Sequence, residues 1–196
     1  MDPFLTSTNV IDWTHPAVLA QARALANGLS DPALVTRRCF EWVRDEIKHS
    51  HDFGLSPVTC AASHVLQEGS GYCYAKSHLL AALLRANGIP TGLCYQRLSR
   101  DGKGAPFSLH GLNAVRLPGV EWYRVDARGN RTGVDAQCVP PIEKLAFSIT
   151  MPGEADLPEV WSDPLSIVVE ALMAHASAAE LWEALPDLPL WTRTSL

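Results

Sequence analysis

Three residues in the middle of the sequence have side chains that could perform nucleophilic catalysis: Cys73, His110 and Asp126. Cys73 follows the glycine-rich stretch 69–71 and opens a long apolar segment that we expect to be a helix. A thiol at a helix N-terminus lies near free backbone N–H groups and the positive end of the helix dipole, which both favour the thiolate. Cys73 is therefore a candidate nucleophile, with His110 as its base and Asp126 as the group that orients the imidazole.

A cysteine with the ordinary pKa of about 8.5 is mostly protonated at neutral pH and needs a partner to react. An imidazole could take the proton of Cys73, or form an ion pair with it, and later protonate a departing amine. The intermediate would be a thioester. Candidate donors to the oxyanion are the backbone N–H of Cys73 and the side-chain amide of Gln67, which could equally be a solvent-facing residue near a helix end.

Helices must position the nucleophile. The segment that begins at Cys73 is apolar on more than one side, so we expect its helix at the centre of the domain. Asp31 is expected to cap one of the preceding helices, and Thr59 another. The spacing of apolar residues, prolines and glycines predicts helices over residues 16–27, 32–48, 60–67, 73–87, 164–175 and 177–185.

Strands must position the other two residues. After Pro90 the apolar period changes to two, which predicts strands over 91–97, 107–117 and 121–127. The last two are joined by a turn that suits type II, with Gly119 at the position that requires a positive φ. Without a bulge, this hairpin pairs His110 directly with Asp126, with Cβ atoms about 4.5–5.5 Å apart.

Size and charge limit the classes of protein to consider. A chain of 196 residues can bury a full core, and no linker divides it, so we expect one domain over residues 1–196. The net charge of −5 indicates neither nucleic acid nor an anionic membrane as a partner. The N-terminus has no basic and then apolar leader, and no later stretch could span a bilayer, so we expect a cytoplasmic location.

The remaining cysteines and histidines have structural interpretations. Five cysteines at irregular spacings are typical of reduced thiols, and we expect Cys39, Cys60, Cys94 and Cys138 to be inert in the core. We expect His78 to be a hydrogen-bonded structural histidine. A zinc site could be considered for His49, His51, Cys60 and His64, but their spacing fits no metal motif. The histidines among them are interpreted as exposed loop residues, and we expect no metal and no cofactor.

Residues 66–130 resemble the transglutaminase-like domain, part of the papain-like cysteine enzyme superfamily. The resemblance rests on four matching pieces, followed by a histidine and an aspartate on successive strands: Gly71-Tyr72-Cys73, His78-Leu79-Leu80, Leu83-Leu84-Arg85 and Gly88-Ile89-Pro90. The chain departs from the family after His110, where Gly111 and Leu112 replace the common alanine and tryptophan, and after Asp126. These departures leave the three candidate residues intact but alter the surroundings of the acyl pocket.

The resemblance implies an α+β papain-like fold, in which a central helix carrying the nucleophile packs on an antiparallel sheet, with extra helices at both ends. It implies cysteine-dependent acyl transfer, and we favour hydrolysis of an amide or peptide bond through a thioester. The alternatives are a non-catalytic member of the fold that binds a peptide or protein, and an amine acyltransferase. The substrate would be a peptide, a protein or a small amide. Nothing in the pattern sets an oligomeric state.

Overall fold

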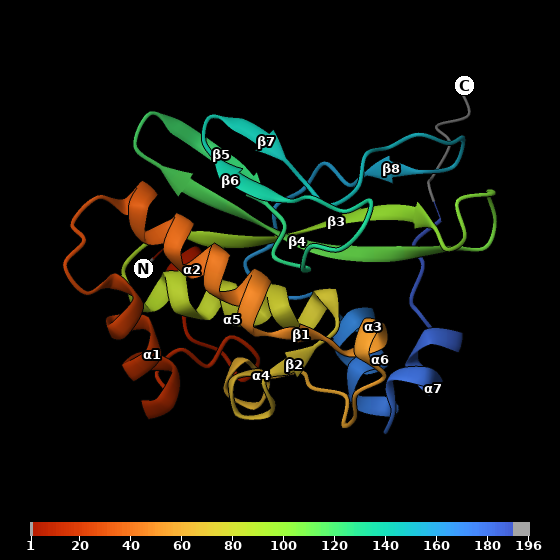
Figure 1. The fold of residues 1–196 in the computed structure, drawn as a ribbon, viewed down its shortest axis with the longest axis horizontal. Coiled ribbons are helices and arrows are strands. Elements are labelled where there is room, and N and C mark those ends of the chain that lie inside the picture. Colours follow the sequence, from red (N-terminus) through yellow and green to blue (C-terminus); the bar gives the residue numbers. More distant parts are fainter. Residues whose placement is uncertain (1, 190–196) are drawn as a thin grey trace.

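A layer of helices packs against one face of a four-stranded antiparallel sheet (Figure 1). The structure, a computed structural model, describes residues 2–189. The strand order β5-β4-β3-β8 is formed by β3 (Thr91–Ser99), β4 (Phe107–Leu117), β5 (Val120–Val125) and β8 (Ala155–Asp156). This is the predicted α+β arrangement.

Helix α5 (Cys73–Ala86) lies at the centre of the domain, as predicted. Its residues from Cys73 to Arg85 are all buried, because the helix packs on β4 and β3 on one side and on other helices around it. A helix that is apolar on more than one side is stable only in such a position. The helices that surround it include α1 (Pro16–Ala26), α2 (Pro32–Glu46) and α4 (Ala62–Glu68).

Of the two predicted N-terminal helix caps, Asp31 and Thr59, only the first is present. Asp31 caps α2, because its carboxylate accepts the backbone N–H of Ala33 at 2.8 Å. Thr59 does not cap α4, which begins later than predicted and after Ala61. The Thr59 hydroxyl instead donates to the carbonyl of Ser70 at 2.9 Å, which ties the chain before α4 to the stretch that leads into α5.

Two short elements lie between α2 and α4, where the histidines at positions 49 and 51 were expected in an exposed loop. Strand β1 (Lys48–His49) pairs in parallel with β2 (Ser70–Gly71), and α3 (Ser50–Phe53) follows it. Because His49 pairs with Gly71, it is brought to the stretch just before the N-terminus of α5. Only long-range pairing creates this neighbourhood, and a local pattern could not predict it.

The β4–β5 hairpin has the predicted turn but a different register. Gly119 has a φ of 80°, as the turn requires. A bulge between Val115 and Leu117 shifts the pairing, so that Asn113 lies opposite Val125. If this register continues by one residue, Asp126 lies opposite Leu112 and diagonally across from His110. The prediction of direct pairing is therefore wrong by two positions: the turn already pairs Leu117 with Val120, which shifts the register by one, and the bulge adds one more unpaired residue.

The last third of the chain extends the sheet and covers one end of the helix layer. Two strands, β6 (Gln137–Val139) and β7 (Ile142–Lys144), form a separate hairpin beside β5. The two predicted C-terminal helices are present as α6 (Ser166–Ala174) and α7 (Ala178–Glu183). A short 3-10 helix, η1 (Pro3–Leu5), precedes α1 near the start of the chain. Over residues 2–189, no helix combines the length and apolar character needed to cross a membrane.

Candidate active site

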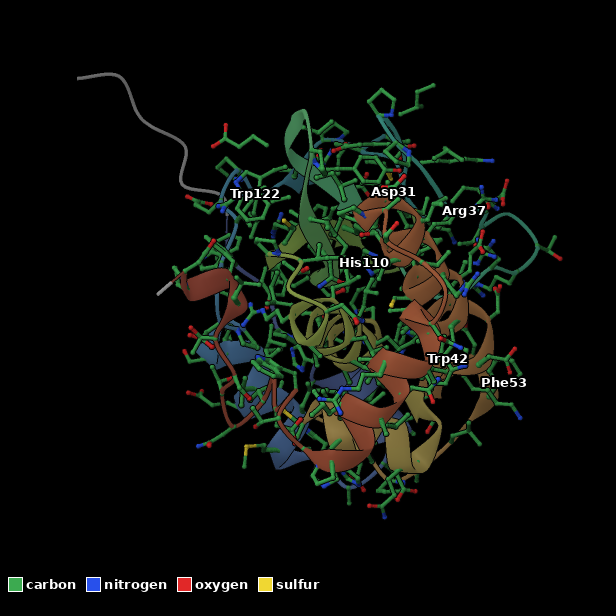
Figure 2. The ribbon with its side chains drawn as sticks, turned by 90° about the vertical axis from the view of Figure 1, so that its left-hand side faces the viewer. Asp31, Arg37, Trp42, Phe53, His110 and Trp122 are labelled. Carbon is green, nitrogen blue, oxygen red and sulfur yellow. The ribbon has the colours of Figure 1, made fainter. Side chains whose placement is uncertain are left out.

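His110 and Asp126 form a buried pair between the sheet and the helices. The His110 Nε2 atom lies 2.7 Å from Oδ2 of Asp126, and His110 is only 5% exposed. In Figure 2 the labelled His110 lies in the interior, where β4 faces the helix layer. The hydrogen bond fixes the ring plane, so that the second ring nitrogen, Nδ1, is the one left for another partner.

The Asp126 carboxylate is held by the backbone as well as by His110. Its oxygens accept N–H groups of Arg128 and Ala146, each at 3.1 Å. Burial alone would raise the pKa of the Asp126 carboxyl, but the charge of His110 and these hydrogen bonds lower it below its ordinary value. Asp126 is therefore ionised at neutral pH although it is fully buried.

Cys73 is the first residue of α5 and lines the same cleft as His110. Burial of His110 would lower the pKa of its imidazole. The charge of Asp126, with Cys73 nearby and the hydrogen bond to Asp126, outweighs this effect and raises the pKa to about 10. The raised pKa favours the imidazolium form of His110 beside the buried carboxylate of Asp126.

A close approach between β4 and α5 sets the distance between His110 and Cys73. A Cβ atom on Gly111 would lie 2.9 Å from Cδ1 and 3.1 Å from Cα of Tyr74, so only glycine fits there without displacement. The buried Tyr74 hydroxyl donates to the carbonyl of Leu109, on the other side of His110. These two contacts hold the residues beside the histidine against the residue that follows the cysteine.

A cleft of about 780 Å³ opens at Cys73. The Phe147 ring meets the His110 ring edge-on, with centroids 5.0 Å apart, and forms one wall. Trp182 of α7 forms part of another wall and stacks on His51, with centroids 4.1 Å apart. The cleft is large enough for an extended amide substrate, since ligand pockets commonly have volumes of about 300–1,000 Å³.

The comparisons with known proteins fit this geometry. The family model of the transglutaminase-like superfamily matches residues 20–127, more than half of the chain and a range that contains all three residues. The chain belongs to the transglutaminase-like superfamily. No curated protein matches the sequence significantly.

Three solved structures are similar to this chain, and the first of them supports the fold. A "putative cysteine protease" from Cytophaga hutchinsonii has a TM-score of 0.52 at 20% identity, over 64% of this chain and 41% of that one. The periplasmic domain of TgpA from Pseudomonas aeruginosa gives 0.43 at 19%, over 57% and 42%. A "putative protease" from Parabacteroides distasonis gives 0.42 at 14%, over 63% and 28%. The chain thus spans less than half the length of each of these proteins.

One predicted residue of the transglutaminase-like site lies elsewhere. Gln67 is exposed near the end of α4, its amide donates to Glu68 at 3.3 Å, and it does not line the cleft. The structure therefore does not bring Gln67 to Cys73, and its interpretation as a solvent-facing residue holds. The backbone N–H of Cys73 remains as a candidate oxyanion donor at the start of the 14-residue α5.

The transglutaminase-like site contains buried charges that the sequence did not indicate. Arg128 forms two hydrogen bonds to Asp52, at 2.7 and 2.9 Å, beneath the cleft. His49 lies beside them, with Nδ1 3.7 Å from an Asp52 oxygen. It is only 6% exposed, so its interpretation as an exposed loop residue is wrong. Burial, together with nearby positive charges, lowers the pKa of His49 well below its ordinary value.

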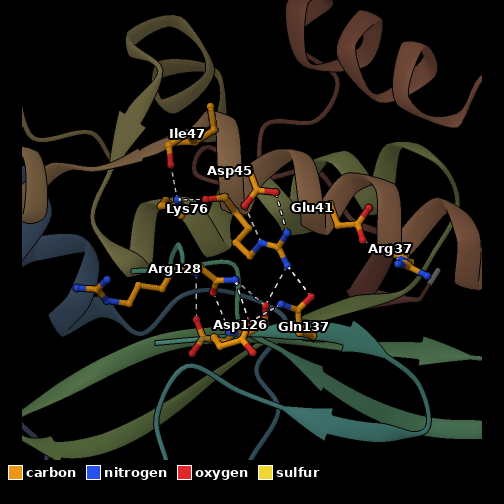
Figure 3. Close-up of polar contacts among 12 residues, drawn as sticks. Arg37, Glu41, Asp45, Ile47, Lys76, Asp126, Arg128 and Gln137 are labelled. Carbon is orange, nitrogen blue, oxygen red and sulfur yellow. Dashed lines mark hydrogen bonds and ion pairs between the residues drawn. The ribbon is translucent and has the colours of Figure 1, made fainter. Parts of the chain in front are cut away.

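Lys76, one turn after Cys73, is fully buried. Its ammonium group donates to the carbonyls of Arg44, at 3.3 Å, and Ile47, where α2 ends (Figure 3). Burial lowers the pKa of Lys76 to about 7. This side chain ties the end of α2 to the first turn of α5, and so helps to fix the segment that carries His49.

The expectations for His78 and for the four remaining thiols are largely met, although Cys60 is only partly buried. His78 is buried, and its Nδ1 atom lies 2.9 Å from the carbonyl of Cys60, as expected of a structural histidine. Burial raises the pKa of four thiols, to about 12 or about 11, so they are poor nucleophiles: Cys39, Cys60, Cys94 and Cys138. Within residues 2–189, no three His, Cys, Asp or Glu side chains gather in a way that could hold a metal ion.

Proposed function

We propose that this chain is a cysteine-dependent acyl-transfer enzyme that hydrolyses an amide or peptide bond through a thioester on Cys73. The observation that carries the proposal is the 2.7 Å contact between His110 and the buried Asp126, on an imidazole that lines the same cleft as Cys73. A buried ionised carboxylate is costly unless it is paired. The pairing supports a role for Asp126 in holding the imidazole of His110 in one orientation.

In the first half-reaction, the Cys73 sulfur attacks the carbonyl carbon of the substrate as a thiolate, because His110 already holds its proton. The C–N bond then breaks, and His110 gives the proton to the departing amine. Asp126 keeps the ring in place and stabilises its positive charge throughout. The acyl group is left on the sulfur of Cys73 as a thioester.

In the second half-reaction, His110 removes a proton from water, and the oxygen attacks the thioester carbon. The C–S bond breaks, the acid is released, and the sulfur leaves as a thiolate beside the protonated His110. An amine in place of water would give acyl transfer, with the same residues in the same roles. The oxyanion of each step would accept the backbone N–H of Cys73, aided by the dipole of α5.

Intact-protein mass spectrometry with a mixed library of amides and activated esters tests the proposal. We expect a mass increase equal to one acyl group, located on Cys73 by peptide mapping and absent from Cys73→Ala. In His110→Ala the acyl-enzyme should form far more slowly. The acyl-enzyme is then incubated in buffer alone or with a panel of amines. Release of the free acid indicates hydrolysis, and formation of a new amide indicates transfer. A library that leaves Cys73 unmodified, while the folded protein binds peptides, would instead support a non-catalytic binding protein.

A further inference from the structure

We propose that the cleft contains a binding site for a substrate carboxylate, formed by Arg131 and Arg100 beside His51 and Trp182. The chain would then act on amides that carry a second, negatively charged group. This inference rests on the proposed function for the amide that reaches Cys73. The carboxylate site itself depends only on the charges that line the cleft.

The acidic side chains that line the cleft already have partners. Asp52 receives two hydrogen bonds from Arg128. The Glu154 carboxylate accepts backbone N–H groups at 2.9–3.0 Å from Ser99, Thr150 and Met151. Both carboxylates are thus occupied by the protein. The two carboxylates are also outnumbered by the three arginines that line the cleft, Arg100, Arg128 and Arg131.

Arg131 is the first of these cations. Its side chain is 55% exposed, and its Nε atom lies 3.8 Å from Asp52, too far for a hydrogen bond. Because Arg128 already occupies both oxygens of Asp52, the guanidinium of Arg131 has donors available to a ligand in the cleft. A planar guanidinium with free donors suits a carboxylate, which can accept two of its N–H groups.

Arg100 is the second cation and is held in place. Its guanidinium lies over the ring of Trp182, with the carbon 4.8 Å from the ring centroid, and donates to the Trp182 carbonyl. Only one of its N–H groups is used in this contact, and Arg100 also lines the cleft. A fixed guanidinium loses less conformational entropy on binding than a mobile one.

The cations of the cleft converge on His51. Burial lowers the pKa of His51, Asp52 opposes this, and the charges of Arg128, Arg131 and Arg100 lower the pKa further. The geometry agrees, because His51 and Arg100 both stack on Trp182, while Arg128 and Arg131 lie beside Asp52. Arginines from two separate segments therefore surround this part of the cleft. The cleft is thus locally positive although the whole chain has a net charge of −5. A cleft lined by one sign of charge attracts ligands of the opposite sign.

We commit to a carboxylate because side chains and chain ends of peptides supply one at a short distance from an amide bond. The test compares two alkylating reagents that differ by one charge: N-chloroacetyl-glutamic acid α-amide and N-chloroacetyl-glutamine α-amide. The sulfur of Cys73 displaces chloride from either reagent, and a thioether forms. We expect the acidic reagent to react roughly tenfold faster, the effect of one charge-assisted hydrogen bond, with a ratio that falls as salt is added.

Variants locate the effect. Arg131→Gln should bring the ratio of the two rates close to one, while Arg131→Lys keeps most of it. Arg37→Gln is the matched control, because Arg37 is an exposed arginine of α2 that pairs with Glu41 outside the cleft. Equal rates for the two reagents in the unmodified protein, or an unchanged ratio in Arg131→Gln, would overturn the proposal.

Binding without reaction separates this inference from the proposed function. In Cys73→Ala, NMR titration with N-acetylglutamic acid α-amide should shift the indole signal of Trp182, and the glutamine analogue should not. If this holds while Cys73 proves unreactive, the carboxylate site stands and the enzyme does not. N-acetylphosphoserine α-amide is the third ligand, and tighter binding of this phosphate than of the carboxylate would contradict the assignment of the site to a carboxylate.

Discussion

Gly111 packs directly against the backbone of Tyr74, so that the strand carrying His110 touches the helix that begins at Cys73. In Gly111→Ala the added methyl group would have to push β4 and α5 apart. We expect the free energy of unfolding to fall by about 1–3 kcal/mol, as in other overpacked sites. The alkylation rate of Cys73 should fall by roughly ten- to hundredfold, because small displacements of catalytic groups are costly. A stable variant with full thiol reactivity would show that this contact does not position the pair.

Asp126→Asn keeps the shape of the side chain and removes its charge. The pKa of His110 is raised mainly by the charge of Asp126, against the effect of burial, so it should fall in this variant. The imidazolium would no longer persist at neutral pH, and turnover should fall by at least about 100-fold, a typical contribution of acid–base catalysis. Steady-state kinetics on the substrate found by acyl trapping measure this. Asp135→Asn, at an exposed carboxylate paired with Lys144, is the control and should leave turnover unchanged.

The elements that position the site could be predicted to a large extent from the sequence. Local signals were sufficient for the start of α5 at Cys73 and for the whole of β4, since glycines, prolines and apolar periodicity are local properties. The hairpin turn at Gly119 was predicted for the same reason. The pairing that the turn sets, Leu117 with Val120, and the bulge next to Arg116 were not predicted, because no residue type requires the bulge. The pairing of His110 with Asp126 was therefore wrong in register although the two side chains meet.

Other features of the site depend on contacts between distant segments. His49 is buried because β1 pairs with β2, and Arg128 is buried because it meets Asp52, which lies 76 residues earlier. Gln67 was considered as an oxyanion donor only because it precedes Cys73 by six residues. That spacing does not determine which side of α4 faces the cleft. The helix that carries Trp182 was predicted, but its position in the wall of the cleft was not. That position depends on contacts with residues from other parts of the fold.

The buried pair of Arg128 and Asp52 should matter for stability. Arg128→Met leaves the Asp52 carboxylate mostly buried without its two hydrogen bonds, and we expect a loss of about 2–4 kcal/mol in the free energy of unfolding. Replacing both residues, as Arg128→Met with Asp52→Leu, should recover part of this loss, because no unpaired charge remains. Urea denaturation of the single and double variants measures the coupling. A double variant no more stable than Arg128→Met would mean that the cost comes from packing alone.

His78 should make the protein sensitive to acid. Burial lowers the pKa of its imidazole from 6.5 to about 4. Between these values the unfolded chain binds a proton that the folded protein does not, so the free energy of unfolding falls as the pH is lowered through this window. The contribution amounts to up to about 3 kcal/mol.

We expect His78→Asn, whose amide can still donate to the carbonyl of Cys60, to remove this part of the acid dependence. His64→Asn, at a residue whose side chain is 41% exposed, is the matched control and should leave it intact. Urea denaturation at both ends of the window gives the answer. Equal acid sensitivity in His78→Asn and the unchanged protein would exclude His78 as its source.

The reactivity of Cys73 as a function of pH tests the central claim most directly. The rate of alkylation by iodoacetamide is followed by peptide mapping, which separates Cys73 from the four thiols whose pKa is raised by burial. An ion pair with His110 predicts rapid labelling that persists well below the ordinary thiol pKa of about 8.5, and its loss in His110→Ala. Labelling of Cys73 that rises only near the ordinary thiol pKa, and equally in both proteins, would contradict the account.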